Sequence, residues 1–131
     1  MASKNSRPFV SWKRLRKSFR YAAEGIRHTW KHEQNFRIHT VIAVLVMVLA
    51  QVLDVPFFEQ AILVIAVGAV LCLELINTAL EHMVDLVIQT FDERAKIIKD
   101  AAAGAVLVFA LTAAVVGGMI FLPRLLELFH L

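Results

Sequence analysis

The sequence has 131 residues, 59% of them hydrophobic, a single cysteine and a formal net charge of +3. This length predicts one domain over residues 1–131, and the apolar share exceeds the roughly 45–50% typical of soluble domains. The composition excludes an intrinsically disordered chain and a disulfide-stapled scaffold, and it favours a small integral membrane protein.

The charge is unevenly distributed. Residues 1–40 carry ten basic and two acidic residues, whereas residues 41–131 carry four basic and nine acidic ones. A basic front end is attracted either to nucleic acid or to an anionic membrane surface. Because long apolar segments follow it, we expect a membrane surface and no nucleic-acid partner.

The first predicted element, within residues 1–32, is an amphipathic surface helix. Over residues 10–31, apolar side chains recur every three or four positions and basic side chains fill the gaps, a pattern typical of a helix in the membrane interface. The apolar positions are Trp12, Leu15, Phe19, Ala22, Ala23 and Ile26, and Phe9, just before this range, continues the same pattern. The alternative is an amphipathic helix packed on a soluble core.

Three transmembrane helices are predicted next, over residues 33–53, 57–90 and 99–122. The last contains an apolar run over residues 101–122 without a charge, about 33 Å long as a helix and sufficient to cross a bilayer. The apolar runs of the first two are shorter, and their flanking residues extend them. Pro56 separates these two helices, since proline ends one helix and can begin the next.

The distribution of lysine and arginine predicts the orientation of these helices. The basic first 40 residues are expected in the cytoplasm, as is the loop around residues 89–100, which carries Arg94, Lys96 and Lys99. The turn around residues 54–60 carries neither Lys nor Arg and is expected outside. The sequence thus predicts an all-α, multi-pass protein of the plasma membrane, with the N-terminus cytoplasmic.

One stripe of polar side chains interrupts the second predicted span. Glu74, Asn77, Glu81 and Asp85 fall within roughly 80° of one another on a helical wheel. Ionisable groups in or beside a span are costly, so they are candidates for function. A solvated helix face would also carry basic residues, whereas this stripe is only acidic and amide.

Further ionisable residues are predicted at the same membrane face. Glu33 begins the first span, and Lys99 and Asp100 begin the third. Clustered carboxylates repel one another unless a cation or a proton neutralises them, and Mg²⁺ is commonly held by one or two carboxylates together with substrate phosphates. The pattern therefore points to phosphoryl transfer from ATP with Mg²⁺, with a further carboxylate as base for a lipid hydroxyl. The glycines form neither a P-loop nor a Gly-x-Gly-x-x-Gly motif.

Less specific interpretations remain beside this one. Glu74 is also compatible with a protonated carboxyl that bridges two helices, and Glu33 with Arg37 has the spacing of a helix-stabilising pair. We expect Asn35 and His39 to make interhelical contacts. A structural membrane module and a small ion carrier are the competing functional classes, although a carrier would need more polar residues along its spans.

Two further segments accompany the stripe in a recognisable pattern. The stripe reads Glu74-Leu-Ile-Asn77-Thr78-Ala79-Leu80-Glu81, with Asp85 and then Lys99-Asp100 downstream. Upstream stand Tyr21-x-x-x-Gly25-Ile26-Arg27 and Glu33-x-Asn35-x-Arg37-x-His39. Over about residues 9–122, the sequence resembles the prokaryotic diacylglycerol kinase family of small membrane lipid kinases.

This resemblance implies a homotrimer of three-span subunits that uses Mg-ATP. It implies that Glu74 is the base for the lipid hydroxyl and that Asn77 orients the reacting groups. It assigns metal binding to Glu33 and Glu81. The residues that it implies for nucleotide or substrate binding are Lys99, Asp100 and Asp85 and, aligned less securely, Arg14 and Tyr21.

The pattern also bears on the lipid. Asn35 with His39, and the element Ser18-Phe19-x-Tyr21-Ala22, resemble the Gram-positive branch, whose members phosphorylate undecaprenol. The resemblance therefore implies an undecaprenol kinase, with diacylglycerol kinase as the alternative, because the active-site residues are common to both.

Overall fold

The structure, a computed structural model, describes residues 10–129 as four helices, and this described part contains no strand. The helices are α1 (Trp12–His32), α2 (Gln34–Val52), α3 (Phe57–Val87) and α4 (Glu93–Leu128). The predicted all-α fold with an N-terminal amphipathic helix is confirmed; Phe9 and the rest of residues 1–9, which the predicted surface segment includes, lie outside the described residues. Three of the helices, α2, α3 and α4, are long and apolar enough to cross a membrane.

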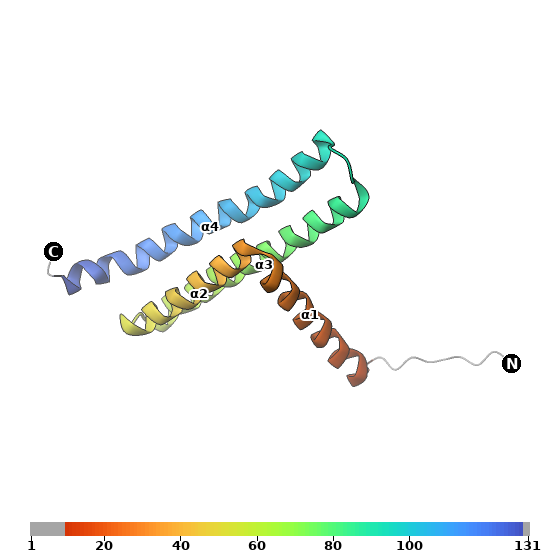
Figure 1. The fold of residues 1–131 in the computed structure, drawn as a ribbon. Helices are drawn as coiled ribbons and strands as arrows, with labels where there is room; N and C mark the ends of the chain where they lie inside the picture. Colours follow the sequence, from red (N-terminus) through yellow and green to blue (C-terminus); the bar gives the residue numbers. More distant parts are fainter. Residues whose placement is uncertain (1–9, 130–131) are drawn as a thin grey trace.

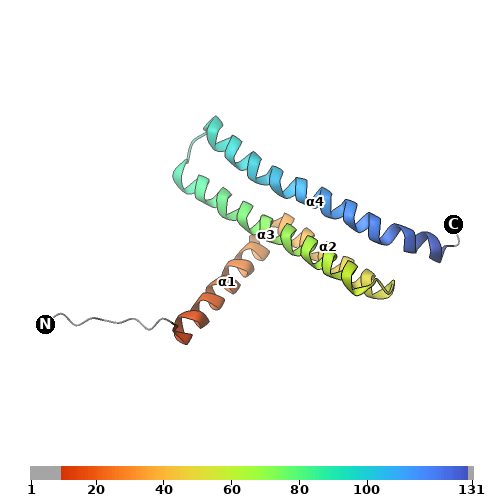
Figure 2. The ribbon, with the colours of Figure 1, turned by 180° about the vertical axis from the view of Figure 1, so that it is seen from behind.

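The three long helices form a layer in which α3 is central. Helix α3 packs along α4 and along α2, and α1 has smaller contacts with α2 and α3. Figures 1 and 2 show α2, α3 and α4 running nearly alongside one another, whereas α1 departs from them at a steep angle. The α1–α2 junction lies partway along α3, between the α2–α3 turn and the connection from α3 to α4.

Only Glu33 separates α1 from α2. Its extended backbone, with φ −103° and ψ 115°, ends one helix and begins the next. The side chain of Arg37 stabilises this corner, because its Nη1 donates hydrogen bonds of 3.0 Å to the carbonyl oxygens of Trp30 and Lys31. These are carbonyls that the end of α1 leaves without a helical partner.

The other two connections follow ordinary rules of helix capping. Asp54, with φ 46°, turns the chain between α2 and α3, and Pro56 is the N-cap of α3. Aspartate tolerates this left-handed conformation better than most residues. At the start of α4, Asp92 Oδ1 accepts hydrogen bonds from the backbone N–H groups of Arg94 and Ala95 at 2.7 and 3.3 Å.

The buried apolar core lies at the end of the layer remote from Glu33. It comprises Ala50, Val55, Leu63, Ile120 and Phe121. At this same end Arg124 Nη1 lies 2.9 Å from Glu59 Oε2, which joins the start of α3 to the end of α4. This cluster thus packs the three long helices together at that end, while Phe36, Val84 and Val106 are buried nearer the polar stripe.

We expect Leu63→Ala to lower the free energy of unfolding by about 2–4 kcal/mol, because Leu63 is only 2% exposed and truncation would leave a cavity. Titration of the detergent-solubilised protein with SDS, followed by circular dichroism, measures this change. Ile65→Ala is the matched control, since Ile65 lies on the same helix and is 69% exposed. Equal losses for the two variants would contradict this placement of the core.

Candidate functional site

The predicted polar stripe lies along α3, because the helix is uninterrupted from Phe57 to Val87. Glu74 and Asn77 are buried, Glu81 is half-buried and Asp85 is exposed. The stripe therefore runs from the interior of the layer outward toward the end of α3. Its first carboxylate is shielded and its last one is accessible to water.

Glu74 contacts α2 through His39. Its side chain is 4% exposed, and its Oε1 lies 3.2 Å from His39 Nε2. The prediction of an interhelical contact for His39 is confirmed. Asn35, His39, Glu74 and Asn77 line one cavity of about 240 Å³, and four small or apolar residues of α4 close it. The cavity-closing residues are Ala103, Val106, Leu107 and Ala110.

Asn77 lies one turn beyond Glu74 on α3 and bonds the next carboxylate of the stripe. Its Nδ2 donates a hydrogen bond of 3.2 Å to Glu81 Oε1. Its Oδ1 is buried and has no hydrogen-bond partner. A buried amide oxygen without a partner is costly, and here it belongs to a residue that lines the cavity beside Glu74.

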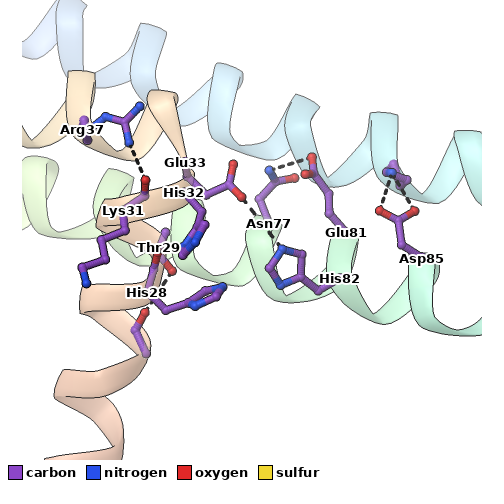
Figure 3. A network of polar contacts seen from close by, with 12 residues as sticks. His28, Thr29, Lys31, His32, Glu33, Arg37, Asn77, Glu81, His82 and Asp85 are labelled. Carbon is purple, nitrogen blue, oxygen red and sulfur yellow. Dashed lines mark hydrogen bonds and ion pairs between the residues drawn. The ribbon is translucent and has the colours of Figure 1, made fainter.

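Glu33 approaches the stripe from the α1–α2 junction. Figure 3 shows its carboxylate pointing toward α3, where Asn77, Glu81 and His82 lie. Glu33 Oε1 is 3.9 Å from His82 Nε2. The charges of Glu33 and Glu81 both act repulsively on Glu74. The structure thus brings the three predicted carboxylates into one cluster.

Three histidines outside the predicted site lie together beside Glu33 in the structure. The ring of His28 stacks on His32 at 4.2 Å between centroids and meets His82 edge-on at 5.9 Å. The four-residue spacing of His28 and His32 was the available signal. The spacing could not reveal His82, because that contact depends on how α1 meets α3.

Arg37 does not form the helix-stabilising pair with Glu33 that its spacing allowed. Its guanidinium is directed to the carbonyls at the end of α1 instead. The Glu33 carboxylate is therefore not paired with Arg37 and points toward α3 (Figure 3).

One lysine of α4 contacts the acidic residue at the outer end of the stripe. Lys99 Nζ donates to both carboxylate oxygens of Asp85, at 2.9 and 3.2 Å. Asp100 pairs with Lys96 one turn away on the same helix. The structure therefore joins Lys99 to the stripe, whereas Asp100 is exposed and pairs within α4.

Arg14 and Tyr21 are not brought to this cluster within one chain. They lie about 28 and 18 Å from Glu33 along the axis of α1, at 1.5 Å per residue. The α1 helix extends away from the layer (Figure 1), and Tyr21 packs its ring against the Arg20 guanidinium at 5.3 Å.

The donor set of the cluster suits a metal that is shared with phosphates. Across residues 10–129, no group of three or more His, Cys, Asp or Glu side chains is arranged to hold a metal ion alone. Glu33 and Glu81 offer hard carboxylate oxygens from neighbouring elements, and Mg²⁺ usually takes one or two such ligands and completes its shell with water and phosphate. The residues present therefore fit a phosphate-bound Mg²⁺ better than a structural metal.

The family model for prokaryotic diacylglycerol kinase matches residues 20–121. Over 112 residues the chain is 47% identical to a diacylglycerol kinase of Synechocystis, with 85% of this chain and 64% of that protein aligned. It is 42% identical over 112 residues to an undecaprenol kinase of Bacillus subtilis, covering 86% of this chain and 91% of the relative.

A diacylglycerol kinase of Escherichia coli K12 is 33% identical over 102 residues, which cover 78% of this chain and 84% of that protein. The chain thus spans a little under two thirds of the Synechocystis relative and most of the other two. The family match includes every residue of the α3 stripe as well as Glu33, His39 and Lys99. Together with the clustered carboxylates, these similarities show that the chain belongs to the prokaryotic diacylglycerol kinase family of lipid kinases.

Proposed function

We propose that this chain phosphorylates undecaprenol to undecaprenyl phosphate with Mg-ATP, at the cytoplasmic face of the bacterial plasma membrane. The observation that carries the proposal is the α3 stripe, which begins at a buried carboxylate beside a cavity and ends at accessible charges. The increase in side-chain exposure from Glu74 to Asp85 suits a reaction between a lipid hydroxyl and a water-soluble nucleotide.

In the proposed reaction, Glu74 accepts the proton of the lipid hydroxyl. The hydroxyl oxygen forms a bond to the γ-phosphorus of ATP, and the bond from that phosphorus to the bridging oxygen breaks, so that ADP leaves with the electron pair. Asn77 orients the reacting groups, since its Oδ1 is an acceptor without a partner beside the cavity.

Glu33 and Glu81 are the proposed Mg²⁺ ligands, and the ion would neutralise charge on the transferred phosphoryl group. Lys99 is proposed to bind the phosphates, and Asp85 holds its ammonium at the end of the stripe. We further propose that Asp100 binds the nucleotide.

A homotrimer is part of the proposal. The candidate spans bury only 17%, 28% and 17% of their most apolar windows within one chain, so most of their surface is left for lipid or for other subunits. Arg14 and Tyr21, which are remote from their own cluster, would then contribute to nucleotide or substrate binding at a neighbouring subunit.

Diacylglycerol is the second candidate substrate, because the Synechocystis relative is named a diacylglycerol kinase. Purified protein with Mg-ATP should phosphorylate undecaprenol faster than diacylglycerol when the two are compared in the same detergent at equal mole fraction. Transfer of radioactive phosphate into each extracted lipid measures the two rates. A preference for diacylglycerol would overturn the undecaprenol assignment, and no transfer to either lipid would overturn the proposed kinase activity.

A further inference from the structure

His39 is the one basic side chain of the described residues within ion-pair distance of Glu74. It lies on α2, its own side chain is 24% exposed, and Glu74 belongs to α3. The contact therefore fixes the carboxylate from a helix other than its own. A buried carboxylate with two like charges nearby is costly unless a donor or a positive charge compensates it.

His39 also stands where two cavities meet. The cavity of about 240 Å³ contains Glu74, Asn77 and Asn35. A second, almost wholly apolar groove of about 380 Å³ runs between α2, α3 and α4 toward Phe121, and it shares His39 and Ala110 with the first. The imidazole thus lines both the pocket that contains Glu74 and the neighbouring groove, which is lined by hydrocarbon.

The two oxygens of Glu74 are therefore not equivalent. Oε1 is the oxygen that approaches His39, at 3.2 Å from Nε2, on the side of the carboxylate that faces α2. A carboxylate that is free to rotate would present either oxygen to a substrate. When a neighbouring side chain holds one oxygen, the carboxylate presents the other oxygen instead. Orientation of this kind lowers the entropic cost of reaching the reactive geometry.

We propose that His39 is a positioning residue for the Glu74 carboxylate: by holding Oε1, it presents Oε2 to the hydroxyl group of the lipid. This inference rests on the proposed function and assigns His39 no contact with substrate. It differs from a packing role, because it requires the donor nitrogen of the ring at this position and not merely its volume.

Three substitutions separate the two roles. His39→Leu keeps much of the volume and removes the donor, whereas His39→Gln keeps an N–H group on a side chain of similar reach. We expect His39→Leu to lower kcat by about 10- to 100-fold, the size of losing a close polar contact to a charged group, with KM for lipid and ATP nearly unchanged. His39→Gln should recover much of that loss. The control is Ile38→Ala, a change at the exposed neighbouring residue, which should leave kcat near wild type.

A double substitution tests whether His39 acts through Glu74. In a Glu74→Gln background, His39→Leu should have little further effect on the residual rate, because the group that it positions has gone. Single-turnover transfer of radioactive phosphate is sensitive enough to measure these rates. A further tenfold loss in that background, or equal kcat values for His39→Leu and wild type, would overturn the inference.

The lipid kinase activity of the wild-type protein separates this test from the test of the proposed function. A wild-type chain that phosphorylates neither lipid contradicts the kinase proposal itself. A wild-type chain that is active, together with a His39→Leu variant of equal kcat, contradicts the role of His39 alone.

Discussion

Glu74→Gln should lower kcat for lipid phosphorylation by about 10²- to 10⁴-fold, the usual contribution of a general base. Glutamine is nearly isosteric with glutamate, and its amide still reaches His39, so the contact between α2 and α3 is preserved. What it lacks is the ability to accept the proton of the hydroxyl group. Initial rates with saturating Mg-ATP and lipid measure the change.

The same variant separates catalysis from the alternative of a carboxyl that merely bridges two helices. A bridging role would reduce thermal stability in detergent and leave turnover per folded molecule intact. Glu127→Gln is the matched control, because it removes a carboxylate near the opposite end of the layer, on α4. Wild-type turnover in Glu74→Gln would disprove the assignment of the base.

Glu81→Ala should raise the Mg²⁺ concentration needed for half-maximal activity by about tenfold or more, because it removes one of two proposed carboxylate ligands. The substitution also removes the acceptor of the Asn77 Nδ2 hydrogen bond. Turnover measured over a range of free Mg²⁺ at fixed ATP gives the shift.

Glu93→Ala provides the comparison for this metal titration. Glu93 is an exposed carboxylate in the first turn of α4, so its loss changes the net charge equally without touching the cluster. An unchanged Mg²⁺ requirement in Glu81→Ala would argue against Glu81 as a ligand. A shift of the same size in Glu93→Ala would attribute the effect to overall charge.

Much of this architecture follows from periodicity and composition. A stripe that is acidic and amide at helical spacing stays on one face when the helix is regular, which is why Glu74, Asn77, Glu81 and Asp85 are found aligned on α3. The length of an apolar run in the sequence indicates the ends of a helix less well than residue spacing indicates its faces. Helix α4 covers Glu93–Leu128 and is thus longer than the apolar run from which the span over 99–122 is predicted; at its start, Asp92 caps a polar first turn.

Contacts between helices were less accessible to sequence reasoning. The rotation of α2 against α3 decides that His39 meets Glu74, and spacing along one helix does not encode that rotation. The steep departure of α1 decides that His28 meets His82 while Tyr21 stays remote. The hydrogen bonds of Arg37 could not be predicted for a similar reason, because its partners are backbone carbonyls of another helix.

The single-residue corner at Glu33 has a mechanical consequence. With no linker between α1 and α2, the chain has no slack in which α1 could tilt independently. Any change in the angle of α1 must be absorbed by the backbone torsions at Glu33 and by the Arg37 contacts that brace the corner. A change in the tilt of α1 would therefore displace the Glu33 carboxylate, which faces α3.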